Sequence, residues 1–204
     1  MLGEGIPAVR IENEAVKAGM PIGPLAISDE VSMTLMVAIR KQTLADLAEA
    51  GESGGMAADH PAFAVTDRMV DEFGRPGKAK GAGFYEYPEQ GGKHLWPGLA
   101  EHFGANNGGE QLSSQDIRDR FLFIEALESV RCVEEGVITS VADANIGSIF
   151  GIGYAPWTGG VLQFLNAYGL PEAVERAKEL AARFGERFEP PALLVRKAEA
   201  GEKF

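Results

Sequence analysis

The chain of 204 residues carries 19 basic and 30 acidic side chains, which gives a formal net charge of −11. So acidic a surface repels phosphate backbones and anionic lipid headgroups, and it disfavours nucleic-acid and membrane-surface roles. Hydrophobic residues make up 45%, enough for a real core, but no apolar run approaches the ~20 residues of a membrane span. The single cysteine, Cys132, excludes an internal disulfide and fits a packed thiol in a cytoplasmic protein.

A glycine–proline turn separates the first two predicted helices. Val9–Ala18 is expected to be helical and to end at Gly19, because a glycine followed closely by a proline stops a helix. The turn Met20–Pro24 cannot be helical, since its two prolines lack an amide donor. Ser28 or Asp29 is expected to cap a helix that runs to about residue 50. A wide apolar side predicts that this helix is central and mostly buried. Its members are Val31, Met33, Leu35, Met36, Val37, Ala38 and Ile39.

Glycine-rich segments surround the third predicted helix. Gly51–Gly55 predicts a loop, and a helix is expected between Pro61 and Gly74. Gly77–Gly83 is basic, but it lacks the Gly-Lys-Ser/Thr ending of a phosphate-binding loop, so we interpret it as a flexible connector. Phe84–Tyr87 predicts a short extended segment that packs an aromatic side chain onto the helices.

Residues 89–113 are expected to form a glycine-rich linker, with turn signals such as Asn106–Gly109. Its two histidines, His94 and His102, are expected to be solvated, and His60 is expected to lie in a turn. The three histidines are far apart, and no spacing of Cys, His and Asp suggests a metal site.

The second half of the chain again predicts helices. Ser113 or Ser114 is expected to cap a long helix, Gln115–Glu135, which ends at Gly136. Further helices are expected at residues 140–150, 171–184 and 191–200.

Two segments of the chain have the same order of predicted helix and glycine–proline turn. Glu4–Ile6 leads through a helix to the turn Gly19–Leu25, and Glu135–Val137 leads through a helix to the turn Gly151–Gly160. In each copy a helix ends at a glycine, a glycine–proline turn follows, and a new helix begins. This predicts an all-α fold of two tandem helical repeats packed on each other. The expected domains are a first repeat at 1–88, a linker at 89–113 and a second repeat at 114–204.

Some polar and glycine motifs favour structural roles. Gly151–Pro156 has two of the three glycines of a dinucleotide fingerprint, but it does not follow a strand, so a simple turn is favoured. Asp143 and Asn145 are two residues apart on a predicted helix and therefore point in different directions. A helix cap or a hydrogen bond between the repeats is the favoured role for them.

Apolar side chains on the two turns have two open interpretations. Met20 and Pro21 lie on the first turn, and Tyr154 and Trp157 lie on the second. Such side chains can cap the core, or they can line a cleft for an acyl chain.

Three motifs in chain order carry a family resemblance. Gly19–Leu25, followed by Asp29, resembles the turn at the start of the helical C-terminal domain of 3-hydroxyacyl-CoA dehydrogenases. Gly74–Tyr87 resembles the basic, aromatic ending of that domain. Arg131–Gly160 is similar to the second copy of the domain in the fused α-subunits that join enoyl-CoA hydratase and dehydrogenase in fatty-acid β-oxidation.

The resemblance implies a parent enzyme that oxidises L-3-hydroxyacyl-CoA with NAD, beside a hydratase activity. The family's NAD fold and catalytic residues precede this region, so no catalytic, cofactor-binding or metal-binding residue is carried over. The chain is therefore expected to be an inactive fragment that begins within the first helix of the domain. The residues carried over, as a wall of the acyl-CoA cleft, are Gly19, Met20, Pro21, Gly23 and Pro24.

The implied partners are an acyl-CoA substrate, the NAD-binding domain, and a thiolase subunit or a second copy of the chain. Two other hypotheses stay open. The first is a stand-alone helical interaction module without catalysis. The second is the helical domain of a different hydroxyacid dehydrogenase, although the second turn, with Trp157 and Gly159–Gly160, argues against a single-copy domain.

Overall fold

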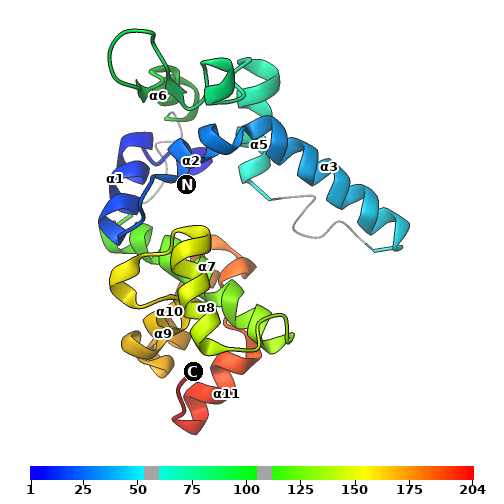
Figure 1. Cartoon of the computed structure of the whole chain (residues 1–204), viewed down its shortest axis with the longest axis vertical. Helices are drawn as coiled ribbons and strands as arrows, with labels where there is room; N and C mark the ends of the chain where they lie inside the picture. Colours follow the sequence, from blue (N-terminus) through cyan, green and yellow to red (C-terminus); the bar gives the residue numbers. More distant parts are fainter. Residues whose placement is uncertain (53–59, 105–111) are drawn as a thin grey trace. The chain divides into compact units, whose positions relative to one another are not determined.

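The computed structural model describes residues 1–52, 60–104 and 112–204. Helices dominate these residues, and the one sheet among them has two short strands (Figure 1). The predicted all-α class is therefore confirmed. The predicted turn Asn106–Gly109 and most of the predicted loop Gly51–Gly55 lie outside the described residues.

The chain forms two compact units, and their members do not follow the halves of the sequence. Unit 1 consists of Met1–Asn13 and Ile22–Gln111, and unit 2 consists of Glu14–Pro21 and Leu112–Phe204. The described part of the expected linker up to residue 104 thus belongs to unit 1, and a piece of the first half belongs to unit 2. The tandem repeat and its boundaries stay a prediction.

Unit 1 begins with short helical elements around the first turn. The helix α1, Ala8–Ala18, ends at Gly19 as predicted, and its last residues from Glu14 on belong to unit 2. The remaining elements of unit 1 are η1 (Leu2–Glu4), α2 (Pro24–Val31), α3 (Met33–Glu49), α5 (Ala62–Asp67), η2 (Arg68–Glu72), η3 (Lys78–Lys80), β1 (Tyr85–Glu86), β2 (His94–Leu95) and α6 (Gly98–Phe103).

The helix expected to start at Ser28 or Asp29 is in fact two helices. Ser32 breaks it with a φ of 78°, a left-handed conformation that is unfavourable for a residue with a side chain. The amide of Met33 donates to the carbonyl of Pro76 at 2.8 Å, a partner distant in the sequence. This long-range bond accompanies the change of direction between α2 and α3, and a local capping pattern cannot anticipate it.

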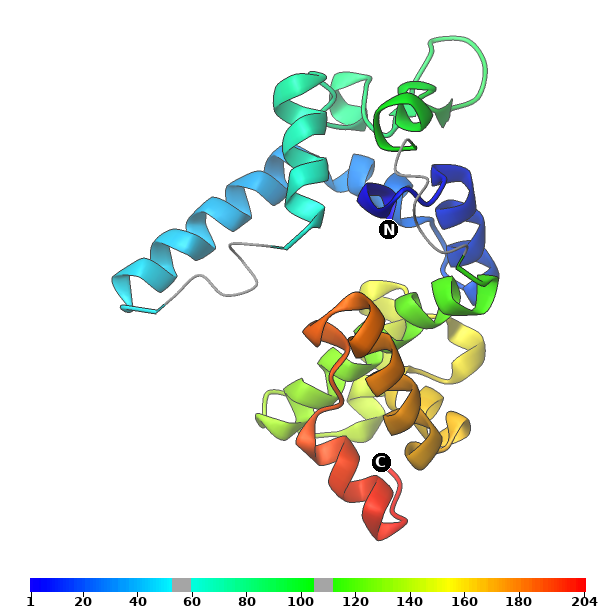
Figure 2. The ribbon, with the colours of Figure 1, turned by 180° about the vertical axis from the view of Figure 1, so that it is seen from behind.

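The prediction that α3 is central and mostly buried is wrong. Among its residues only Met33 is buried, while Leu35 is 49% exposed and Ile39 is 56% exposed. Figures 1 and 2 show α3 as a long helix, and within unit 1 it contacts α2, α5 and η2. A wide apolar side therefore does not face the core of unit 1.

Part of the expected linker is regular structure. Tyr85 pairs with Leu95 in the antiparallel ribbon of β1 and β2, and α6 follows directly. The ring of His102 stacks on Phe73 with centroids 4.5 Å apart, so the expectation that His102 is solvated is wrong. Gly77–Gly83 is also not an irregular connector, because it contains η3 within a hydrogen-bonded turn.

Unit 2 is a helical bundle with a continuous apolar core. Its longest helix, α7 (Ser114–Glu134), is capped by Ser113, whose Oγ accepts from the amide of Asp116 at 3.0 Å. Phe123, Leu127 and Val130 of α7 are fully buried. The other elements are α8 (Val141–Ile152), η4 (Pro156–Thr158), α9 (Val161–Tyr168), α10 (Leu170–Phe184), η5 (Glu186–Phe188) and α11 (Ala192–Ala200).

Candidate functional site

The two turns that the sequence pairs meet in unit 2. The indole Nε1 of Trp157 donates to the carbonyl of Ala18 at 2.7 Å. Gly19 has a φ of 106°, and a side chain there would collide with the Trp157 ring and with Ala155. Only glycine therefore lets the end of α1 approach the second turn so closely. A Cβ at Gly153 would likewise press against the ring of Pro21.

The meeting point of the turns carries exposed apolar side chains. Trp157 is 68% exposed, Ile152 is 63% exposed, and Pro21 is also exposed. Tyr154 differs from them, because it is fully buried and its hydroxyl donates to the carbonyl of Leu122 at 3.2 Å. Of the two interpretations left open, core packing applies to Tyr154, while Trp157 and Pro21 are free to contact a ligand.

The segment that holds Gly19 and Pro21 is fixed to unit 2 by buried charge. The carboxylate of Glu14 accepts from Arg118 at 2.6 Å and from Lys17 at 2.9 Å. These two hydrogen bonds, that from Lys17 first, lower the pKa of Glu14 to about 2. The carboxylate therefore stays charged and paired throughout the physiological range.

Gly23 and Pro24 belong to unit 1 and begin α2 there. The Oε1 atom of Glu12 accepts from the amide of Leu25 at 2.7 Å, and Oε2 accepts from the hydroxyl of Tyr85 at 2.6 Å. A Cβ at Gly23 would collide with the Glu12 carboxylate. The predicted site residues are thus divided, with Gly19, Met20 and Pro21 in unit 2 and Gly23 and Pro24 in unit 1.

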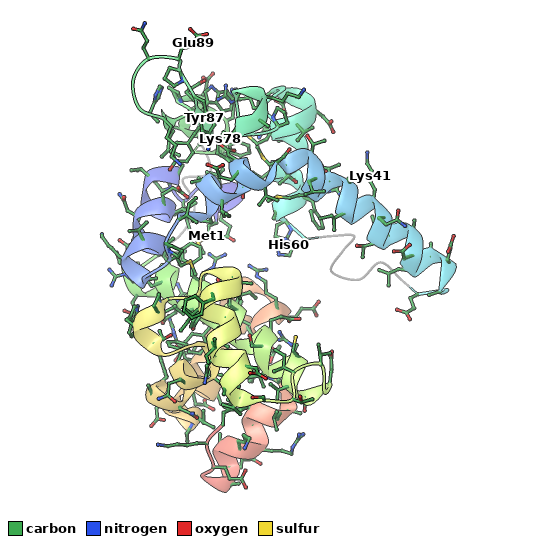
Figure 3. The ribbon with its side chains drawn as sticks, in the orientation of Figure 1. Met1, Lys41, His60, Lys78, Tyr87 and Glu89 are labelled. Atoms are coloured by element: carbon green, nitrogen blue, oxygen red, sulfur yellow. The ribbon has the colours of Figure 1, made fainter. Side chains whose placement is uncertain are left out.

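A second buried carboxylate, Asp29, organises the aromatic segment of unit 1. It accepts from the amides of Phe84 and Tyr85 at 2.8 and 2.9 Å, and from the hydroxyl of Tyr87 at 2.9 Å. Figure 3 labels Tyr87 and Lys78, and Lys78 forms an ion pair with the next residue of α2, Glu30. Burial, and then the hydrogen bonds to the carboxylates, raise the pKa values of Tyr85 and Tyr87 above the ordinary phenol value. Asp29 is therefore an anchor for this segment and not a helix cap.

One comparison with known proteins identifies this part of the chain. Residues 1–87 match the family model described as 3-hydroxyacyl-CoA dehydrogenase, C-terminal domain. Residues 1–87 belong to this family. The match ends at Tyr87, the last of the aromatic residues that Asp29 holds.

The 3-hydroxyacyl-CoA dehydrogenase family uses NAD, but the described residues do not fit that cofactor. A dinucleotide site needs a parallel strand–helix–strand unit with glycines at the start of the helix. The described part of the chain has only the antiparallel ribbon of β1 and β2. Gly151 and Gly153 lie at the end of α8, where the helix dipole is negative and repels a phosphate.

The described residues contain neither a candidate metal-binding cluster nor a candidate membrane-spanning helix. No group of three His, Cys, Asp or Glu side chains among them is arranged to hold a metal ion. No helix among them combines the length and the apolar character that crossing a bilayer requires.

An unpaired carboxyl that no sequence pattern indicated lies in unit 2. Glu125 is half-buried on α7, and its buried Oε2 atom has no hydrogen-bond partner. Burial raises the pKa of Glu125 to about 7. Burial first, and then the negative charge of Glu125, raise the pKa of the Tyr154 phenol. Spacing alone gives no signal for such a residue, because its environment comes from tertiary packing.

A pocket in unit 2 lies away from the predicted site residues. Its volume is about 430 Å³, and it opens to solvent between the end of α9 and the outer side of α10. Three of its six lining residues are acidic: Glu172, Glu175 and Glu179. Its one basic residue, Arg176, is paired with Asp116 and Asp119 at 2.6 and 2.8 Å. An anionic ligand such as CoA is therefore disfavoured there.

Proposed function

We propose that the chain is the helical part of an NAD-dependent L-3-hydroxyacyl-CoA dehydrogenase of fatty-acid β-oxidation, fused in the parent to an enoyl-CoA hydratase. The observation that carries this proposal is the match of residues 1–87 to the C-terminal domain of the family. The similarity of residues 131–160 to the second copy of the domain supports the fusion.

Within that enzyme, the paired turns form part of the acyl-CoA cleft. The exposed side chains of Trp157, Ile152 and Pro21 offer an apolar surface for an acyl chain. The ion pair of the buried Glu14 with Arg118 of α7 holds the first turn in place. Gly23 and Pro24, the other two proposed cleft residues, set the start of α2 in unit 1.

The chain supports this reaction without performing it. Oxidation of a 3-hydroxyl group needs a base for the hydroxyl proton and a nicotinamide for the hydride. The buried carboxylates of Glu12 and Asp29 are already occupied as hydrogen-bond acceptors. In this proposal the base and the cofactor come from the NAD-binding domain, which is the first proposed partner. A thiolase subunit or a second copy of the chain is the further partner, and the cytoplasm is the proposed location.

Fluorescence of Trp157 tests the binding surface. In a Trp96→Phe variant, Trp157 is the only tryptophan of the chain, so its emission reports this surface alone. Titration with a long-chain 3-hydroxyacyl-CoA is expected to shift and saturate the emission, while CoA without an acyl chain leaves it unchanged. Ile152→Asp in the same background is expected to weaken the acyl-CoA response. Absence of any acyl-dependent change would contradict the proposed cleft wall.

Absorbance of NADH tests the lack of catalysis. The unaltered chain, mixed with NAD and a 3-hydroxyacyl-CoA, is expected to produce no NADH. Turnover by this chain alone would refute the division of labour between the helical part and the NAD-binding domain.

A further inference from the structure

The helices α2 and α9 share local features, as the predicted duplication requires. Each has eight residues and follows a turn. Each is also capped from the preceding helix, because Glu12 accepts from the amide of Leu25 in unit 1 and Asn145 accepts from the amide of Leu162 in unit 2. These shared features support the predicted duplication.

The next positions correspond at the same spacing along the chain. Ser32 after α2 has φ and ψ of 78° and 122°, and Gly169 after α9 has 95° and 119°. Asp29 binds the amide of Phe84, and Asn166 binds the amide of Phe204. Each residue of α2 and of the first turns of α3 therefore has an equivalent residue in unit 2.

In unit 2, the equivalent surface is covered by α7. The ring of Phe123 meets Phe164 and Tyr168 of α9 edge-on, with centroids 5.4 and 5.1 Å apart. Asp119 of α7 accepts from Arg176 of α10 at 2.8 Å. Phe123 is fully buried by this packing. The long helix α7 thus packs over α9 and the start of α10.

In unit 1, the matching residues are apolar and exposed. Ile27 and Val31 take the places of Phe164 and Tyr168, and Ile39 takes the place of Arg176. Their exposed fractions are 43, 44 and 56%, and the adjacent Leu35 is 49% exposed. We call Ile27, Val31, Leu35 and Ile39 the α2–α3 face. Lys41, whose side chain stands out from α3 in Figure 3, does not belong to it.

We propose that the α2–α3 face binds an amphipathic helix from outside residues 1–204, which lies on α2 as α7 lies on α9. The proposal rests on the predicted duplication and not on the proposed enzymatic role. An aromatic or large aliphatic side chain of the incoming helix packs between Ile27 and Val31. Phe123 contacts the equivalent residues of unit 2, Phe164 and Tyr168, in this way. An apolar residue replaces Asp119, because Ile39 offers no charge where unit 2 has Arg176.

A grafted helix tests the proposal on the full chain. Residues 114–131 of this chain, carrying Asp119→Leu, are joined directly before Met1. In this register the grafted copy of Phe123 precedes Gly5 by as many residues as Phe123 itself precedes Gly136. The matched control is the same graft with its copy of Phe123 changed to Asp, and a second control carries Ile27→Asp in unit 1. Circular dichroism checks that each variant keeps its helices.

Amide hydrogen exchange is then compared for residues 24–49. The graft is expected to slow exchange there by about tenfold or more, and both controls are expected to lose this protection. Binding of an apolar dye is expected to fall with the graft as well. Unchanged exchange and dye binding would overturn the proposal. Sedimentation that shows a dimer of the unaltered chain, dissociated by Ile39→Asp, would overturn it too, because a second copy would then be the occupant.

Discussion

The substitution Glu125→Gln is expected to stabilise unit 2 at alkaline pH and to leave it unchanged in acid. The carboxyl has an ordinary pKa of 4.5 and a pKa of about 7 in the folded chain, because burial disfavours its charge. A folded-state pKa above the unfolded value means that ionisation favours unfolding. The stability of the unaltered chain therefore falls as the pH rises from about 4.5 to about 7, and it falls no further above that range.

The size of the effect follows from the same pKa. One pKa unit corresponds to about 1.4 kcal/mol, so the full difference is about 3 kcal/mol. Because Glu125 is only half-buried, solvent screening reduces this to about 2 kcal/mol. Glutamine has nearly the same shape and no charge, so the variant should be more stable than the parent by about that amount near pH 8 and equal to it near pH 4.

Urea unfolding, followed by the fluorescence of Trp157 in the Trp96→Phe background, measures this difference for unit 2. The matched control is Glu128→Gln, an exposed residue on the same helix paired with Arg131 at the surface. It should change stability by less than about 0.5 kcal/mol at either pH. If Glu125→Gln gave no gain near pH 8, Glu125 would have a partner or a solvent path in the folded chain, and the reasoning would fail.

Three more substitutions test the packing of unit 1. Ser32→Gly should raise the stability by about 1 kcal/mol in thermal unfolding, since glycine adopts a φ of 78° without strain, and Ser32→Ala should give no such gain. Asp29→Asn should lower the free energy of unfolding by about 2–4 kcal/mol, because two backbone amides lose a charged acceptor. Limited proteolysis should then cut the chain near Tyr85. A segment as resistant to the protease as in the unaltered chain would argue that Asp29 does not anchor it. Gly23→Ala should lower the free energy of unfolding by about 2 kcal/mol, because the added Cβ collides with the Glu12 carboxylate. A double-mutant cycle with Glu12→Ala should show a coupling energy of about 1 kcal/mol. Additive effects of the two substitutions would rule out the collision.

Some features were predictable because their causes lie within a few residues. The end of α1 at Gly19 and the cap of α7 by Ser113 depend on local backbone geometry and on neighbouring hydrogen bonds. The family resemblance was also local, because the motifs Gly19–Leu25 and Gly74–Tyr87 lie within the matched residues 1–87.

The features that sequence analysis misassigned depend on distant partners. Asp29 has the pattern of a helix cap, but its bonds go to Phe84 and Tyr85, more than fifty residues away. His102 was expected in solvent, and it stacks on Phe73.

The sequence by itself determined the helical class, the ends of most helices and the family of residues 1–87, because short-range hydrogen bonds and backbone conformation set them. Only the tertiary structure decided that α3 leaves Leu35 and Ile39 exposed and that Glu125 lies half-buried without a partner for Oε2. Burial is a property of the whole packing arrangement. An apolar stripe or a carboxyl on a helix does not indicate which other helix, if any, will cover it.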